Sequence, residues 1–541
     1  YLAAFEMTVK NAHPATIMAS YNMINGAHST ENKRLLTDIL RNEWGFKGLV
    51  MSDWGACSRL STSVKAGQDL DMPGTRGEHQ EKCIKDFEEG LITEDEINVA
   101  AERMMALVDK YNYKKTRTRK PCDHHKAAVD VAKKCAVLLK NDGILPLEGV
   151  KKVTVIGELA RTMRFQGGGS SHINVPEYKN AIKAFEELGI EVEFAAGYHV
   201  KDDIAEIALE MEAEDVARVA AKEGRPVLFF GGLTDIAEGE GYDRTTLAMP
   251  QNQVRLFDKI YAANDNIIYV SFSGAPYTVP FVNKVRAVLH MYLCGEATGE
   301  ASVSILTGET NPSGKLAETF PIDIEDTPAY GSFGTREKNV DYSEGVLIGY
   351  RYYDTKRMAV EYPFGFGLSY TNFEYENLRV RNGEKPLEYT VTFKIRNIGD
   401  RDGYEAAQVY VGNPGDLRPV KELKGFAKPF VKKGETVEVS VTLDARSFAI
   451  YDVLGRSFAV PEGNYQILVG ASSRDIRLTG NIAMASLDAE GASLPVITAE
   501  RAAESMKTKL YLLADGTEGD PFFSFDKPGI EPYTLSASLS E

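Results

Sequence analysis

Short apolar runs that alternate with helical stretches constrain the fold of this chain more than any other feature. They follow one another through the middle of the sequence, at residues 153–157, 192–196, 227–231, 267–272 and 287–293. Strands that are apolar along their whole length are buried on both faces, and strands separated by helices pair in parallel. We therefore expect a mainly parallel sheet with helices on both faces, opened by a helix from Asp123 to Lys140.

The period of the apolar residues changes to two towards the C-terminus. Every second residue from Tyr389 to Ile395 is apolar, and a turn follows at residues 397–400. Short alternating strands joined by regular turns are typical of a β-sandwich. No side chain in this region suggests catalysis, so its expected role is stability or subunit contact.

These patterns divide the chain into five parts. A Thr93/Glu96 capping box predicts a helix over 93–111 at the end of the first part. An aromatic connector precedes the β-sandwich, and a tail follows it in which residues 499–513 could form one helix. The predicted bounds of the five parts are 1–118, 119–325, 326–384, 385–486 and 487–541.

Composition narrows the classes of function. The 541 residues include 62 basic and 78 acidic side chains, giving a net charge of −16. This charge argues against binding to nucleic acid or to an anionic membrane and suits a neutral substrate such as a sugar. No apolar run approaches the roughly 18 residues that a membrane helix needs. The five scattered cysteines match no disulfide framework or metal motif, and the adjacent His124 and His125 face different directions.

One apolar run near the N-terminus ends abruptly in a carboxylate and an indole. In the stretch Gly48–Gly55, the residues Leu49–Met51 are followed by Ser52, Asp53 and Trp54. The C-terminal ends of parallel barrel strands are rigid places that hold reactive groups. A carboxylate there can attack the anomeric carbon of a sugar while the indole packs on the ring. Alternatively, Asp53 caps the next helix and Trp54 is part of the core.

A second acidic cluster lies on a glycine-rich loop, Glu238–Arg244, after the strand that ends at Gly231. Glycine lets the backbone approach a ligand closely. Asp243 and Arg244 could pair with other charges of the loop, which would leave a glutamate free to titrate. The alternative is an ordinary solvated acidic loop.

These residues resemble glycoside hydrolase family 3, the β-glucosidase family. The resemblance runs from residue 1 to about 485 and includes the Ser52–Trp54 motif, the loop 239–244, the turn before Phe320 and the aromatic stretches 349–354 and 363–370. It implies an α/β multidomain chain. Its parts would be the C-terminal part of a (β/α)8 barrel, an α/β sandwich with a mainly parallel sheet, and a fibronectin-III-like β-sandwich.

The resemblance also implies roles for particular residues. Asp53 would be the nucleophile and Glu240 the acid/base, with Glu238 as the nearest rival for that role. Trp54, Tyr21 and Ser171 would contact substrate or hold the nucleophile, and Ser170 is almost as good a candidate as Ser171. The implied activity is a retaining, exo-acting β-glucosidase that cleaves terminal β-D-glucosyl residues by double displacement, without metal or organic cofactor.

The chain also departs from the family pattern. It begins at Tyr1 in what looks like the middle of a domain, and only the last three barrel strands are expected in it. Either an upstream segment is missing or another chain, such as an N-terminal fragment chain, supplies it and completes the barrel. A homodimer is also a possible partner. The alternatives are a β-xylosidase or another β-glycosidase of the family, or a truncated, non-catalytic carbohydrate-binding protein. We expect a soluble protein and favour the cytoplasm over the periplasm or secretion.

Overall fold

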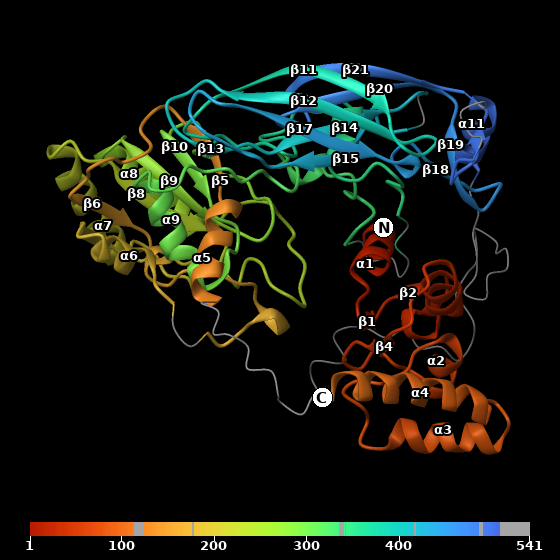
Figure 1. Cartoon of the computed structure of the whole chain (residues 1–541). Helices are drawn as coiled ribbons and strands as arrows, with labels where there is room; N and C mark the ends of the chain where they lie inside the picture. The colour runs from red at the N-terminus through yellow and green to blue at the C-terminus, as the bar shows by residue number, and fades with distance from the viewer. Residues whose placement is uncertain are drawn as a thin grey trace. The chain divides into compact units, whose positions relative to one another are not determined.

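The structure, a computed structural model, describes residues 1–112, 124–175, 178–334, 340, 342–415, 418–485 and 491–508. Its contacts divide the chain into two compact units, one built on Tyr1–Cys122 and the other on Asp123–Lys507. Figure 1 labels the helices and strands of both units. None of the described helices has the length and apolar character to cross a membrane.

The first unit is built around two parallel strands. Strand β1, Thr16–Ala19, pairs with β4, Leu49–Ser52, along its whole length. A single bridge between Met51 and Leu70 continues this sheet, so the third predicted strand is reduced to one paired residue. The other elements are α1 Ala3–Ala12, β2 Met23–Ile24, β3 Ala27–His28, a 3-10 turn Ser29–Glu31, a π-helix Arg34–Glu43, α2 Leu60–Ala66, α3 Glu78–Glu88 and α4 Glu94–Tyr111.

A buried carboxylate fastens the strands of this unit to its helices. Asp69 accepts hydrogen bonds from Arg41 at 2.7 Å, from Arg103 at 2.8 Å and from the backbone N–H of Val50 at 2.8 Å. A buried charge is tolerated when it is paired and hydrogen-bonded in this way. The predicted capping box is also confirmed, because the Thr93 hydroxyl accepts from Glu96 N while the Glu96 carboxylate accepts from Thr93 N.

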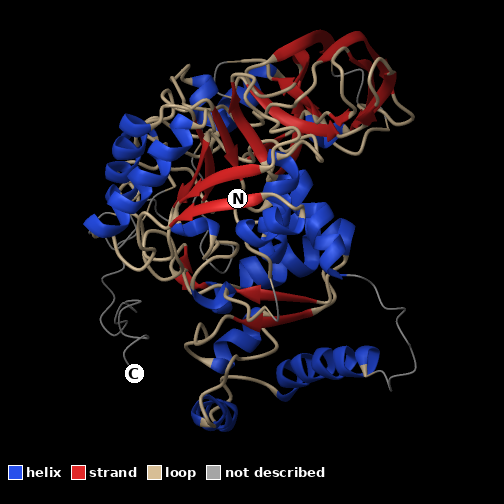
Figure 2. Ribbon diagram, turned by 90° about the vertical axis from the view of Figure 1, so that its left-hand side faces the viewer, coloured by secondary structure: helices blue, strands red, loops and turns tan. Residues whose placement is uncertain are grey.

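The second unit begins with an α/β domain whose six-stranded sheet has the order β5-β10-β9-β8-β6-β7. All neighbours pair in parallel except β5 with β10, which confirms the mainly parallel sheet. Helix α7 packs beside α8, and α9 packs beside α5 and α6, so helices cover both faces (Figures 1 and 2). The elements are α5 His124–Cys135, β5 Val137–Asn141, β6 Lys152–Ile156, α6 Ala181–Glu187, β7 Glu191–Ala195, α7 Ile207–Lys222, β8 Val227–Gly232, α8 Gln251–Ala263, β9 Ile267–Phe272, β10 Ala287–His290 and α9 Thr298–Leu306.

The predicted helix from Asp123 to Lys140 is wrong in its last five residues. Helix α5 ends at Cys135, and the chain continues as strand β5 from Val137. The run Ala136–Leu139 is apolar enough for either structure, and antiparallel pairing with β10 makes it a strand at the edge of the sheet. His125 pairs with Glu296 and Glu300 instead of facing His124.

The β-sandwich starts earlier than the predicted residue 385. Strand β11, Phe373–Asn382, pairs antiparallel with β12, Tyr389–Asn397, so the predicted connector 326–384 contains the first strand of the domain. Helix α10, Tyr350–Thr355, also lies in that connector. The remaining strands are β13 Gly403–Tyr404, β14 Ala407–Gly412, β15 Lys421–Ala427, β16 Phe430–Val431, β17 Thr436–Leu443, β18 Ile450–Asp452, β19 Ser457–Pro461, β20 Gly463–Gly470 and β21 Ile476–Met484.

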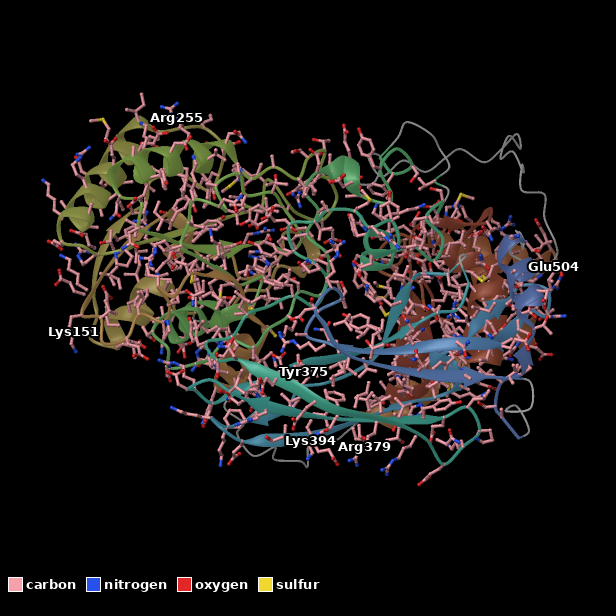
Figure 3. All side chains as sticks on the ribbon, turned by 90° about the horizontal axis from the view of Figure 1, so that it is seen from above. Lys151, Arg255, Tyr375, Arg379, Lys394 and Glu504 are labelled. Carbon is pink, nitrogen blue, oxygen red and sulfur yellow. The ribbon has the colours of Figure 1, made fainter. Side chains whose placement is uncertain are left out.

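The two-residue alternation places the apolar side chains of the sandwich in its core. Val391, Phe393 and Ile395 are buried in one cluster with residues of β14, β17 and β20. Arg379 and Lys394, which Figure 3 labels, point away from that core.

Part of the predicted tail packs against the sandwich. Strand β22, Val496–Ile497, pairs with β19, and helix α11, Ala499–Lys507, is held by an ion pair of Arg501 with Asp452 at 2.7 Å. The helix therefore covers the first half of the predicted stretch 499–513. Residues 509–513 lie outside the described residues.

Candidate active site

Asp53 lies directly after the end of strand β4. Its backbone N–H donates to the Ala19 carbonyl at the end of β1, at 2.8 Å, so the parallel pairing of the two strands fixes its position. The Asp53 carboxylate accepts from the backbone N–H of Trp54 at 2.7 Å. Helix α2 has Arg59 at its N-cap, so Asp53 does not cap it and the alternative role is excluded.

Trp54 and Tyr21 occupy the same edge of this small sheet as Asp53. The Trp54 side chain is 53% exposed, so it does not belong to the core of its unit. Tyr21 follows the end of β1 by two residues and is also exposed. Because the ends of paired parallel strands meet at one edge, an acid and two aromatic side chains lie at the same edge of the sheet.

The second acidic cluster lies on the loop that follows β8 in the other unit. Its two glutamates differ in their partners. Glu238 accepts from Arg164 at 2.6 Å and from the Gly274 N–H at 2.9 Å. Glu240 is exposed and accepts from Ser170, whose hydroxyl and backbone N–H both donate to the same carboxylate oxygen at 2.5 Å.

These contacts separate the rival candidates for the acid. Arg164 and the Gly274 N–H both bind one carboxylate oxygen of Glu238, which fixes this side chain within the loop. Glu240 has its carboxylate on the surface of the loop, beside the glycine-rich segment that contains Ser170 and Ser171. The hydroxyl of Ser171 donates to the Gly168 carbonyl within that segment. Of the two candidate serines, Ser170 is the one that contacts the candidate acid.

Glycine is required where the two loops meet. Gly169 has φ of 83°, and a Cβ at this position would lie 2.5 Å from the Glu240 Cβ. Any larger residue would therefore push Glu240 away from Ser170. The Ser170 hydroxyl and then its N–H lower the pKa of Glu240. A group that acts as an acid near neutral pH needs the opposite shift, so the contact with Ser170 works against an acid role for Glu240.

Arg164 binds the acidic loop through several hydrogen bonds. This role of Arg164 was not predicted from the sequence. Its buried guanidinium donates to the carbonyls of Leu233 and Glu238 and pairs with the carboxylates of Asp235 and Glu238. A planar guanidinium with several donors suits this work. The sequence hinted at this role by placing an arginine between the apolar residues Met163 and Phe165, just before a glycine-rich loop.

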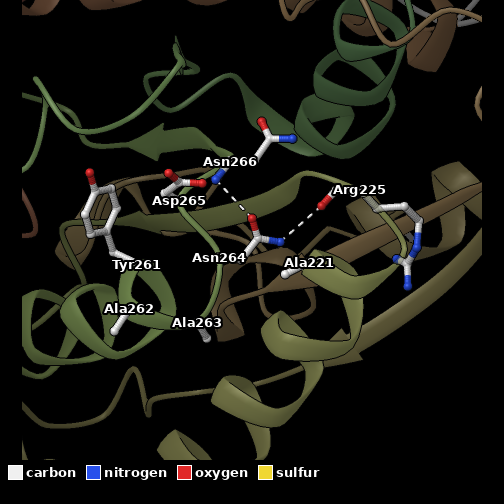
Figure 4. Close-up of a pocket in the computed structure, with 9 residues that line it drawn as sticks. Ala221, Arg225, Tyr261, Ala262, Ala263, Asn264, Asp265 and Asn266 are labelled. Atoms are coloured by element: carbon white, nitrogen blue, oxygen red, sulfur yellow. Dashed lines mark hydrogen bonds between the residues drawn. The ribbon is translucent and has the colours of Figure 1, made fainter.

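A hollow of about 430 Å³ in the α/β domain lies away from these residues. It is lined by residues just before β8 and β9, among them Arg225, Tyr261 and Asn264 (Figure 4). Asn264 donates to the Arg225 carbonyl at 3.1 Å and accepts from the Asn266 N–H at 3.0 Å. The hollow is at the N-terminal edge of these strands, whereas ligands of open α/β sheets bind at the C-terminal edge, where Glu240 lies.

Comparison with known families accounts for all three folded regions. Residues 1–107 match the Glycosyl hydrolase family 3 N terminal domain, residues 136–370 the Glycosyl hydrolase family 3 C-terminal domain, and residues 405–473 the Fibronectin type III-like domain. A crystal structure of a Bifidobacterium adolescentis GH3 beta-glucosidase matches with a TM-score of 0.84 and 40% identity, over 90% of this chain and 72% of that one. The chain belongs to glycosyl hydrolase family 3.

Two curated members of family 3 are similar over most of this chain. An Exo-alpha-(1->6)-L-arabinopyranosidase of Bifidobacterium longum is 42% identical over 92% of it. A Thermostable beta-glucosidase B of Acetivibrio thermocellus is 38% identical over 89% of it. The chain spans 66% and 65% of the length of these two relatives.

Membership of family 3 makes the contact between Ser170 and Glu240 testable. Replacing Ser170 by alanine removes one of two donors that stabilise the charged carboxylate, so the pKa of Glu240 should rise. The alkaline limb of the pH profile of kcat/KM, which reports the acid of the free enzyme, should then move to higher pH. Ser171→Ala is the matched control, because the Ser171 hydroxyl bonds to Gly168. A limb that moves equally in both variants would assign it to another group.

Proposed function

We propose that this family 3 chain carries the two catalytic carboxylates of a retaining, exo-acting β-glucosidase. The observation that supports this most is the position of Asp53, at a strand end beside Trp54 and at the same sheet edge as Tyr21. A carboxylate there can reach the anomeric carbon of a bound sugar. Glu240, on an exposed loop at the C-terminal edge of a second sheet, is the proposed acid/base. The substrate class is a small or oligosaccharide β-glucoside.

The proposed reaction is a double displacement. Asp53 attacks the anomeric carbon and forms a glycosyl ester while Glu240 gives its proton to the leaving glycosidic oxygen. Glu240, now a carboxylate, takes a proton from water, and the oxygen of that water attacks the same carbon and releases Asp53. Two inversions leave the configuration of the sugar unchanged. The carboxylates supply nucleophile and proton, so the proposed steps call on no cofactor.

A second candidate is an α-L-arabinopyranosidase, because a relative with that name is 42% identical to this chain. An arabinopyranosyl ring lacks the hydroxymethyl group of glucose, as xylose also does. A pocket that binds the hydroxymethyl group would favour glucosides over arabinopyranosides and xylosides. The substrate preference therefore distinguishes the candidate activities. A substrate that lacks a hydroxyl which the site hydrogen-bonds can lose up to roughly 10⁴-fold in kcat/KM. The loss for a missing methylene is far smaller.

The test compares kcat/KM for the 4-nitrophenyl glycosides of β-D-glucose, β-D-xylose and α-L-arabinopyranose. We expect the glucoside to be preferred by at least about tenfold, the lower end of what one contact discriminates. A reversed preference would replace β-glucosidase by the arabinopyranosidase or xylosidase alternative. Glucose binding without turnover of any of the three would support the non-catalytic carbohydrate-binding alternative.

A further inference from the structure

Three side chains with metal-binding atoms meet in the first unit, close in sequence to Asp53. Cys57 follows Asp53 by four residues, Asp71 follows the bridge residue Leu70, and His79 lies in the first turn of α3. The Cys57 sulfur, a carboxylate oxygen of Asp71 and a ring nitrogen of His79 all lie within 4.8 Å of one another. They come from three separate segments, so the fold and not a short motif brings them together.

The three side chains are shielded from water. Cys57 is 3% exposed, and the side chains of Asp71 and His79 are 6% and 14% exposed. His79 Nδ1 lies 2.9 Å from an Asp71 oxygen, and among the described residues no lysine or arginine pairs with Asp71. A buried carboxylate is found paired or bound to a metal.

Backbone contacts hold the three segments in place. The Ser52 hydroxyl accepts from Met72 N at 2.8 Å, and Gly55 N donates to the Met72 carbonyl at 2.9 Å. The Thr75 hydroxyl accepts from His79 N at 2.8 Å. The segment with Cys57 is therefore tied to the segment with Asp71, and that segment to the start of α3. A preformed arrangement of ligands lowers the cost of binding an ion.

We propose that Cys57, Asp71 and His79 form a binding site for Zn²⁺. A thiolate, an imidazole and a carboxylate are the ligands that Zn²⁺ takes in proteins, whereas Mg²⁺ and Ca²⁺ prefer oxygen alone. Bond lengths of about 2.0 to 2.3 Å in a tetrahedron place neighbouring ligand atoms roughly 3.3 to 3.6 Å apart. The three ligand atoms lie within 4.8 Å of one another, and a water molecule would complete the tetrahedron.

Binding changes the protonation of the site. The Cys57 thiol loses its proton to solvent and becomes a thiolate, and His79 binds as neutral imidazole. Because the thiol must lose its proton when it binds the ion, affinity should rise with pH. The ion would connect the loop that follows Asp53 to the segment 71–79. This proposal does not depend on the roles proposed for Asp53 and Glu240.

The test uses Co²⁺ as a spectroscopic probe and Zn²⁺ as a competitor on the reduced, metal-free protein. We expect one Co²⁺ per chain, with a near-ultraviolet charge-transfer band from thiolate to cobalt that Zn²⁺ abolishes. The band should disappear in Cys57→Ser, and the affinity should fall at least tenfold in His79→Gln. Cys83→Ser is the matched control, because Cys83 is one helical turn from His79 but lies outside the cluster.

A second measurement does not need the variants to fold. Iodoacetamide reaches the buried Cys57 only when its segment opens, so bound Zn²⁺ should slow the alkylation of Cys57 in the unmodified protein. The alkylation of the partly exposed Cys83 should not change, as read from the peptide masses. The proposal is overturned if no thiolate band forms, if the band survives in Cys57→Ser, or if Zn²⁺ protects Cys83 instead of Cys57. Neither readout measures turnover, so failure here leaves the proposed glycosidase function untouched.

Discussion

Replacing Asp53 by alanine is expected to lower kcat for an activated aryl β-glucoside by at least about 10⁴-fold, the scale of loss on removing a catalytic nucleophile. Backbone contacts set the position of Asp53, because its N–H donates to the Ala19 carbonyl and β1 pairs with β4. Its carboxylate accepts from the N–H of the next residue, Trp54, so the variant should keep the fold of the wild type. Steady-state kinetics measure the loss, and thermal unfolding checks the fold. Asp95→Asn, which removes an exposed carboxylate at the start of α4, is the matched control.

Two chemical experiments separate a nucleophile from a residue that only shapes the pocket. A 2-deoxy-2-fluoro glucoside with a good leaving group should form a stable ester on the peptide that contains Asp53, detected as an added mass. In Asp53→Ala, azide should give no product with retained configuration, because the first inversion is missing. Labelling of another carboxylate, or retained stereochemistry in this variant, would assign the nucleophile elsewhere.

Burial on both faces made the central strands predictable. Every residue of β8 and β9 is buried, and the predicted ranges 227–231 and 267–272 agree with the observed strands to within one residue. A continuous apolar run of this length, between helical stretches, has few other places in a folded domain. The same reasoning predicted the position of Asp53. The apolar run Leu49–Met51 predicted a buried strand, and Asp53 was expected directly after its end.

Pairing between distant segments decided the elements that the sequence did not predict. Val137–Asn141 is a strand because β10 lies beside it, although the local sequence continues a helical pattern. Strand β11 is the edge of its sheet and carries exposed charges such as Glu374, Arg379 and Arg381, so it resembled a connector. Edge strands commonly carry such charges, which weakens their apolar signal.

The choice between neighbouring side chains in a loop was equally beyond the sequence. Ser170 and Ser171 have the same chemistry, and the left-handed backbone at Gly169 determines that Ser170 faces Glu240. The cluster of Cys57, Asp71 and His79 has no recognisable spacing, because the sheet and α3 bring the three side chains together. Loops that close around a site are thus fixed by contacts that a single sequence does not reveal.

Replacing Glu240 by alanine should slow substrates with poor leaving groups far more than activated ones. A positioned general acid contributes roughly 10²–10⁴-fold, and this is lost only where the departing oxygen needs a proton. We therefore expect kcat/KM to fall about 10³-fold for an alkyl glucoside or cellobiose but less than about tenfold for 2,4-dinitrophenyl β-glucoside. The measurement is the slope of log kcat/KM against the pKa of the leaving group, which should steepen in the variant.

Glu238→Gln is the control that gives this result its meaning. Glu238 is bound to Arg164 and to Gly274 N, so its loss should disturb the loop and lower kcat/KM for all leaving groups alike. Azide should accelerate only Glu240→Ala, by attacking the glycosyl ester without the help of a base, and should give a β-glucosyl azide. If instead Glu238→Gln shows the steep dependence and Glu240→Ala the uniform loss, the acid is Glu238, and the bond of Ser170 to Glu240 only holds two loops together.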